Sequence, residues 1–235
     1  MYLGYVVAER SLCRTPNTES ETYMSVVTFD PVAASAAPGP ARRKLIVDID
    51  STAWALLEAM DRIHTHGDVT RPGAGTITYQ TVETWDDLIP RSGGLSAMLS
   101  LFNRSFCIES MRAIGLFPGF IEAMRTFSDA GADICLWSDR DERFEHETEQ
   151  FMREEGVPFE SLIVTSPFDK VEMALELGIT TIIDDKPATL EAACEAGLSA
   201  FTLAYRYNAD VIKKYGIAHA TSWPDLAKMV LASFR

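Results

Sequence analysis

From Arg42 onward, short apolar runs alternate with stretches in which apolar residues recur at helical spacing. The apolar runs predict strands at residues 44–49, 133–137, 162–165, 180–183 and 199–203. The stretches with helical spacing predict helices at residues 53–63, 118–130, 142–155, 170–177 and 188–196. Gly178 and Gly197 mark two helix ends, and Ser222 with Pro224 is typical of the start of a last helix. Five strands alternating with helices predict a parallel sheet covered on both faces.

The alternation lapses between residues 53 and 115. Residues 67–75 are rich in turn formers, 76–81 are β-like, and 82–89 and 95–114 have helical patterns. An insertion that follows the first strand lies above the carboxyl ends of the strands, where ligands bind in open α/β sheets. We therefore expect a mainly helical cap at about residues 53–115.

Residues 1–41 differ in composition from the rest of the chain. Two short β-like runs at 2–8 and 22–28 flank a polar segment, and residues 31–41 have the small-residue and proline content of a linker. We interpret this part as an N-terminal extension, either a β-hairpin or disordered, although translation from Met24 is an alternative. The main domain is then expected at residues 42–235.

The composition and the net charge limit the classes of protein and of binding partner that are compatible with the sequence. The chain has 235 residues, of which 47% are hydrophobic, enough for one α/β domain with a buried core. It contains no apolar run of the roughly 18–20 residues that span a membrane, and its N-terminus lacks a signal-peptide pattern. We expect a cytoplasmic protein with no membrane partner. Its four cysteines form no CxxC pair, and a disulfide framework is not expected.

The net charge is −13, with 34 acidic and 21 basic residues. This field repels long nucleic acid, which is bound mainly through neutralised phosphates. A small phosphorylated substrate remains compatible with it, because a metal ion and a few local cations reverse the sign inside a pocket.

Acidic residues gather at two predicted strand ends. Asp48 and Asp50 follow the first strand, and Asp184 and Asp185 follow the fourth. Acids at a strand end are often only solvated loop residues or helix caps. Two pairs at the same sheet edge, however, form a cluster that is costly unless a cation neutralises it, and oxygen ligands without nearby His or Cys suit Mg²⁺. Paired carboxylates also support nucleophilic and acid–base catalysis.

These residues carry a resemblance to the haloacid dehalogenase (HAD) superfamily over about residues 43–204. The string 48–52 (DIDST) resembles the first motif of that family, Ser138 the second, Lys170 the third, and the Asp184-Asp185 pair the fourth. All four occur in the family's order and on the expected elements. The resemblance implies a Rossmann-like three-layer sandwich with a five-stranded parallel sheet and a cap inserted after the first strand.

The resemblance also implies roles. Asp48 would be the nucleophile and a metal ligand, and Asp50 the general acid/base, with its backbone carbonyl reaching the metal. Ser138 and Lys170 would hold the phosphoryl oxygens. The remaining Mg²⁺ ligands would be Asp184 and Asp185, the latter directly or through water. An acid at the position of Asp50 favours a phosphatase over a dehalogenase.

Two further residues have open roles. Thr52 is expected to support the turn after the first strand. Arg140, two residues after Ser138, either contacts a substrate phosphate or base, or forms a surface ion pair with Asp141 or Glu142.

The substrate class is suggested by the cap and two short strings. The helical insertion, residues 116–119 (LFPG) and 184–187 (DDKP) are similar to those of small 5′(3′)-deoxyribonucleotidases, although Ser51 stands where those enzymes usually have Gly. We expect a nucleoside monophosphate or another small phosphorylated metabolite. A polynucleotide-end phosphatase, a phosphotransferase and a non-catalytic interaction module remain alternatives.

Some residues in the insertion have two interpretations. His64 and His66 have the spacing of a metal pair but no third ligand nearby, and are expected to be ordinary helix-end residues. Four aromatic residues are expected to pack in the core, with stacking on a substrate base as the alternative for one of them: Trp54, Trp85, Phe102 and Phe106.

Overall fold

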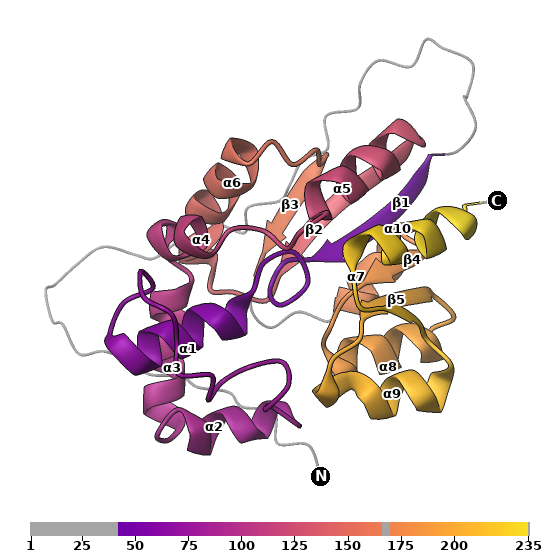
Figure 1. Ribbon diagram of the computed structural model, residues 1–235. Coiled ribbons are helices and arrows are strands. Elements are labelled where there is room, and N and C mark those ends of the chain that lie inside the picture. Colours follow the sequence, from indigo (N-terminus) through magenta and orange to yellow (C-terminus); the bar gives the residue numbers. More distant parts are fainter. Residues whose placement is uncertain (1–41, 166–169, 235) are drawn as a thin grey trace, which may run out of the picture. The chain divides into compact units, whose positions relative to one another are not determined.

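The structure is a computed structural model that describes residues 42–165 and 170–234 (Figure 1). The predicted N-terminal extension at residues 1–41 lies outside the described residues. Within the described part of the chain, no helix is long and apolar enough to cross a bilayer.

The central sheet is parallel, as predicted. In the described residues it contains six strands in the order β3-β2-β1-β4-β5-β6. The strands are β1 (Arg43–Asp48), β2 (Ala132–Ser138), β3 (Ser161–Val164), β4 (Thr181–Ile183), β5 (Ser199–Leu203) and β6 (Ala218–Ala220). The expectation of five strands was wrong by one. The edge strand β6 has only three residues with a histidine in the middle, too short to produce a recognisable pattern.

The strand β1 lies in the middle of the sheet, and its central residues are apolar on both faces. Its Leu45, Ile46 and Val47 are fully buried, which is typical of a parallel strand covered on both sides. The chain continues from β1 to β2 and β3 on one side and then crosses to β4 on the other. The gap between β1 and β4 is therefore a topological switch point, the usual ligand position in such sheets.

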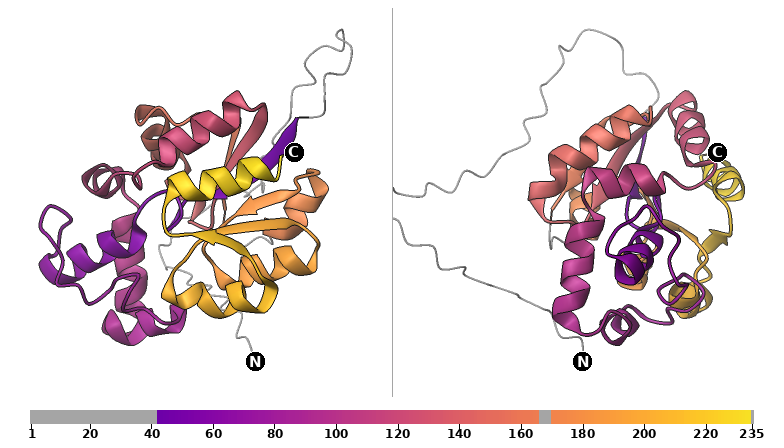
Figure 2. Two further views of the ribbon diagram at one scale, coloured as in Figure 1. Left: turned by 45° about the vertical axis from the view of Figure 1, so that its right-hand side comes forward. Right: turned by 60° about the vertical axis from the view of Figure 1, so that its left-hand side comes forward.

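The two faces of the sheet are covered by different helices. Leu45 and Val47 point to the face covered by α5 (Phe120–Asp129), α6 (Glu145–Glu154) and α10 (Trp223–Ala232). Ile46 points to the opposite face and packs with α7 (Lys170–Glu176) and α8 (Pro187–Glu195). The remaining helix of this part of the chain, α9 (Ala209–Tyr215), packs against α8. Figures 1 and 2 show α5 and α10 side by side, and the expected three-layer sandwich is confirmed.

A mainly helical cap follows β1 and lies beyond its carboxyl end (Figure 1). It comprises α1 (Leu56–His66), a short 3₁₀ turn (Trp85–Asp87), α2 (Leu88–Arg91), α3 (Leu95–Ser105) and α4 (Ile108–Ile114). The expected helix at 53–63 begins only at Leu56, because Trp54 forms single β-bridges with Asp50 and Leu116. The predicted helix at 95–114 is divided at Phe106 and Cys107.

The β-like segment at 76–81 is not a strand. Its backbone is instead held by the buried carboxylate of Asp61, which accepts hydrogen bonds from the backbone N–H groups of Gly75, Thr76 and Ile77 at 2.6–2.9 Å. The loop approaches so closely that a Cβ at Gly73 would lie 2.0 Å from Oδ2 of Asp61. A buried carboxylate thus replaces the neighbouring strand that an apolar β-like run requires.

Candidate active site

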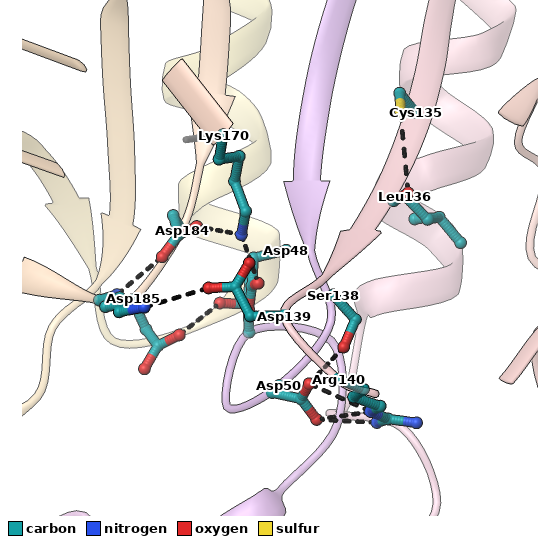
Figure 3. Close-up of polar contacts among 12 residues, drawn as sticks. Asp48, Asp50, Cys135, Leu136, Ser138, Asp139, Arg140, Lys170, Asp184 and Asp185 are labelled. Carbon is teal, nitrogen blue, oxygen red and sulfur yellow. Dashed lines mark hydrogen bonds and ion pairs between the residues drawn. The ribbon is translucent and has the colours of Figure 1, made fainter. Parts of the chain in front are cut away.

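Three buried carboxylates meet at the switch point. Asp48 is the last residue of β1, and Asp184 and Asp185 follow β4 directly. One oxygen of each lies within 4.8 Å of the others. The Nζ atom of Lys170, at the start of α7, lies 2.7 Å from Oδ1 of Asp48 and 2.6 Å from Oδ2 of Asp184 (Figure 3). The four side chains expected from separate parts of the sequence are therefore in one cluster.

The charges of this cluster do not balance. Burial raises the pKa of Asp48 well above its usual value; the ammonium of Lys170 opposes this shift, and the charges of Asp184 and Asp185 reinforce it. Burial and the charge of Asp184 raise the pKa of Asp185 to about 7. Burial alone would lower the pKa of Lys170, but the charges of Asp184 and Asp48 raise it well above its usual value. Three acids thus share one firmly protonated amine.

The donor set fits a hard divalent cation. Three carboxylates are clustered, and one of their oxygens, Oδ2 of Asp48, is buried and has no hydrogen-bond partner among the described residues. An unpaired buried carboxylate oxygen is costly unless a cation or donor meets it. Oxygen donors without histidine or thiolate are those that Mg²⁺ binds.

The carboxylate of Asp185 is fixed from two sides. Thr52 Oγ1 donates a hydrogen bond to its Oδ1 at 3.2 Å, and the hydroxyl of Tyr207 donates to its Oδ2 at 2.6 Å. Thr52 therefore contacts the acid cluster in addition to lying in the turn after β1. Tyr207 was not anticipated, because it lies 22 residues beyond Asp185 and belongs to no motif.

The turn between Asp48 and Thr52 has an unusual backbone. Ser51 has φ of 63°, and it is the one non-glycine residue with positive φ in ranges 42–165 and 170–234. The hydroxyl of Tyr205 donates to the carbonyl of Ser51 at 2.7 Å, and Nε1 of Trp223 donates to that of Thr52 at 2.8 Å. Glycine adopts this left-handed conformation without the steric cost that a side chain adds.

Asp50 belongs to a second cluster, on the other side of the strand end (Figure 3). Ser138 Oγ donates to its Oδ2 at 2.6 Å, and Trp54 Nε1 donates to its Oδ1 at 2.9 Å. Arg140 forms an ion pair with Oδ1 through Nη2 at 2.8 Å. Burial acts to raise the pKa of Asp50, but the Arg140 charge and these hydrogen bonds hold it below its usual value.

Of the two alternatives for Arg140, the surface ion pair with Asp141 or Glu142 is not formed, because Arg140 pairs with Asp50. Arg140 is 1% exposed and turns inward to Asp50, 90 residues earlier in the chain. Its guanidinium lies between two aromatic rings, 5.3 Å from the centre of the Trp54 ring and 4.7 Å from that of Phe106. The sequence around Arg140 favours a pair with the neighbouring acids. Its actual partner, Asp50, lies in the turn after another strand and cannot be identified from that local sequence.

A pocket of about 340 Å³ joins the two clusters to the cap. Its floor is formed by acidic and basic residues of the sheet edge: Asp48, Asp50, Asp139, Arg140, Asp141, Asp185 and Lys186. Its roof comes from the cap: Leu56, Trp85, Leu99, Phe102, Asn103 and Phe106. The volume falls within the usual range for small-molecule sites, at its lower end, and the apolar roof over a charged floor is typical of them.

Three of the four aromatic residues singled out in the insertion line this pocket. Trp85, Phe102 and Phe106 do so, and the ring of Phe102 is stacked on that of Phe106 with centres 5.9 Å apart. The ring of Trp85 also packs on Tyr207, at 5.7 Å. Trp54 is fully buried, as expected for core packing.

Two further observations concern the histidine pair of the insertion and a lysine of the pocket lining. His66 Nε2 lies 2.8 Å from the carbonyl oxygen of Pro72 at the end of α1, and the histidine pair is outside the pocket lining. In the pocket lining, Lys186 Nζ lies 3.1 Å from Oδ2 of Asp139. That pair was not anticipated, although each partner directly follows a predicted site residue.

The comparisons with known proteins identify the fold. No family model and no curated protein matches the sequence. The structure is similar to a HAD family hydrolase from Deinococcus radiodurans R1 with bound phosphate and sodium, at a TM-score of 0.56 and 17% identity, covering 82% of this chain and 96% of that one. A haloacid dehalogenase-like family hydrolase from Streptococcus pneumoniae gives a TM-score of 0.54 and 16% identity, covering 83% and 99%.

A predicted phosphatase from Clostridium acetobutylicum is also similar, at a TM-score of 0.55 and 13% identity, covering 81% of this chain and 99% of that one. Each of these chains is matched almost over its whole length. At such low sequence identities the similarity concerns the fold. The described chain therefore has the fold of the haloacid dehalogenase-like hydrolases.

Proposed function

We propose that this protein is a Mg²⁺-dependent phosphomonoester hydrolase that acts through an aspartyl-phosphate on Asp48. One observation carries the proposal: Asp48 and Asp50 line a single pocket but have opposite surroundings. Asp48 has a buried oxygen, Oδ2, with no hydrogen-bond partner among the described residues, so a lone pair is available for attack. Asp50 lies two residues after Asp48, and its carboxylate is held by several hydrogen-bond donors, as an acid/base beside a nucleophile should be.

In the first half-reaction, a carboxylate oxygen of Asp48 attacks the phosphorus of the substrate. A P–O bond to Asp48 forms while the P–O bond to the leaving group breaks. The leaving-group oxygen keeps the electron pair of that bond and takes a proton from Asp50, which has received it from the monoanion of the substrate phosphate. Lys170 and Ser138 hold the phosphoryl oxygens, since phosphoryl transfer depends mostly on positioning and charge neutralisation.

In the second half-reaction, water attacks the phosphorus of the aspartyl-phosphate. The water gives a proton to Asp50, the bond between phosphorus and Asp48 breaks, and its electron pair returns to the Asp48 carboxylate. Asp50 returns this proton to the phosphate, the phosphate is released, and both carboxylates are ionised again.

The metal would be held by Asp48, Asp184 and Asp185, whose carboxylates are already assembled. When bound, Mg²⁺ neutralises the negative charge of substrate and acids during transfer. Thr52 and Tyr207 would keep Asp185 in place for it.

The substrate we favour is a nucleoside monophosphate. Three aromatic residues form much of the pocket roof, and a base stacked on such rings gains about 1–3 kcal/mol. A pocket of about 340 Å³ suits a mononucleotide better than a polynucleotide end. The acids Asp139 and Asp141 at its floor also repel the further phosphates of a longer chain.

The test is phosphate release from nucleoside monophosphates, sugar phosphates and phosphoserine, with Mg²⁺ and with EDTA. We expect metal-dependent release that is fastest with one or two nucleotides. Intact-mass measurement after rapid acid quenching should find phosphate attached to the wild-type chain and none on Asp48→Asn. Metal binding without release from any substrate would favour a non-catalytic module, and transfer to an added alcohol a phosphotransferase.

A further inference from the structure

The carboxylate of Asp50 has no vacant position in the described structure. Its Oδ1 accepts from Trp54 Nε1 at 2.9 Å and from Arg140 Nη2 at 2.8 Å. Its Oδ2 accepts from Ser138 Oγ at 2.6 Å, and Arg140 Nε is shared between both oxygens at 3.1 Å each. A carboxylate has about four acceptor positions. For Asp50 to exchange a proton with a substrate, one donor must leave.

The donors differ in how firmly they are held. Arg140 Nη1 donates to Thr148 Oγ1 at 2.9 Å and lies 3.1 Å from Met111 Sδ. Its guanidinium is also sandwiched between the rings of Trp54 and Phe106. Trp54 is fully buried, and its backbone is bridged to Asp50 and Leu116. The Ser138 hydroxyl, in contrast, turns about a single bond, and is the donor that a phosphoryl oxygen can take.

We propose that Arg140 is a positioning residue that, with Trp54, fixes Asp50 so that only its Oδ2 becomes free. This inference rests on the proposed function. A phosphoryl oxygen that takes the hydroxyl of Ser138 vacates one acceptor position on Oδ2. That oxygen then exchanges the proton with the leaving group and later with water, while Oδ1 stays anchored.

The side chain of Arg140, which holds Asp50, also contacts the cap. Phe106 and Met111 belong to the cap, whereas Thr148 lies on α6 of the main domain. Phe106 lines the substrate pocket on one side and packs on the Arg140 guanidinium on the other. The position of the cap thus bears directly on the group that orients the acid/base.

The leaving group provides the test. p-Nitrophenyl phosphate and phenyl phosphate are similar in size, but p-nitrophenolate leaves with little help from an acid, whereas phenolate needs more. Misplacing the acid should therefore affect phenyl phosphate selectively. General acid–base catalysis contributes about 10²- to 10⁴-fold. We expect Arg140→Lys to lower kcat on phenyl phosphate about 100-fold and on p-nitrophenyl phosphate less than about 10-fold, with little change in KM.

A second variant guards against misfolding. Thr148→Val keeps the shape of the side chain, removes the acceptor of Arg140 Nη1 and lies outside the pocket lining. We expect the same selective loss on phenyl phosphate, but smaller. Arg153→Lys is the matched control, because Arg153 is exposed on α6 and pairs with Glu149. It should leave both rates unchanged, and the melting temperature of each variant should be measured alongside.

The double variant Asp50→Asn/Arg140→Lys completes the design. If Arg140 acts through Asp50, it should be no slower than Asp50→Asn alone. Three results would each overturn the inference: an equal loss of kcat on both substrates, a change in KM alone, or additive losses in the double variant. The proposed function would still stand in each case if the wild-type protein turns over its substrates. A wild-type protein inactive on both substrates and on the nucleotide panel would instead refute the proposed function and the inference with it.

Discussion

The hydroxyl of Tyr207 donates a hydrogen bond of 2.6 Å to Oδ2 of Asp185, and so ties the loop after β5 to the acid cluster. This bond acts to lower the pKa of Asp185, against burial and the charge of Asp184, which together raise it to about 7. The tyrosine therefore favours the ionised form of Asp185, the form that binds a cation.

Removing this hydroxyl should weaken metal binding. We expect Tyr207→Phe to raise the Mg²⁺ concentration needed for half-maximal activity about 10- to 100-fold, as for other groups that orient metal ligands. The effect should grow as the pH falls toward 6, because more Asp185 is then protonated. The measurement is a Mg²⁺ titration at several pH values. Tyr215→Phe, whose hydroxyl bonds Glu191 and Glu195, is the control, and an equal shift in it would refute the prediction.

Asp48→Asn should abolish turnover without unfolding the protein. The amide is a poor nucleophile, while the substitution removes a buried charge whose desolvation is unfavourable. We expect a loss of more than about 10³-fold in kcat at a melting temperature no lower than that of Asp129→Asn, an exposed control. Residual activity above a few per cent of wild type would show that Asp48 is not the nucleophile.

The aromatic roof of the pocket should determine the preference for nucleotides. Phe102→Leu keeps an apolar side chain but removes the ring that is stacked on Phe106. We expect kcat/KM to fall about 5- to 150-fold for nucleoside monophosphates, the equivalent of about 1–3 kcal/mol, and to change little for glycerol phosphate. Steady-state kinetics on both substrates decides the matter, and a parallel fall for glycerol phosphate would indicate damage to the site as a whole.

Asp61 should stabilise the cap in a pH-dependent manner. Burial acts to raise its pKa, but the N–H groups of Ile77, Gly75 and Thr76 lower it below the usual value. A carboxyl group with a depressed folded-state pKa stabilises the fold above its unfolded pKa of about 3.9, and this contribution is lost as the pH falls through the folded-state pKa.

Asp61→Asn should accordingly reduce the free energy of unfolding by about 1–3 kcal/mol at pH 7, because hydrogen bonds to a charged group are lost. The difference from wild type should narrow at pH values below about 4. Urea unfolding at both pH values measures this, with Asp129→Asn as the control at an exposed site. A difference that stays constant with pH would mean that the Asp61 charge has no part in holding the loop.

Residues that follow an apolar strand were predictable from the sequence. In parallel sheets the carboxyl ends of strands share one edge, so the positions of Asp48, Ser138 and Asp184 follow once the strands are located. Lys170 required the resemblance, because nothing in its local pattern indicates that it turns toward the acids. The strand β6 was missed, since three residues give no periodicity.

The partners of the site residues were much less predictable. Arg140 and Asp50 are 90 residues apart, and Tyr207 and Asp185 are 22 apart. Such pairs depend on where loops from different strands come together, and no local pattern records this. Similarly, the β-like segment at 76–81 has the composition of a strand, but two of its backbone N–H groups donate hydrogen bonds to the carboxylate of Asp61.

Two of the three rings that roof the pocket also contact a residue that holds one of the acids. Trp85 packs on Tyr207, which holds Asp185, and Phe106 packs on Arg140, which holds Asp50. A mutation at Trp85 or Phe106 that admits a different leaving group therefore also disturbs a residue beside the acids. At these two positions a new specificity is expected to arise through paired changes, one facing the ligand and one compensating behind it.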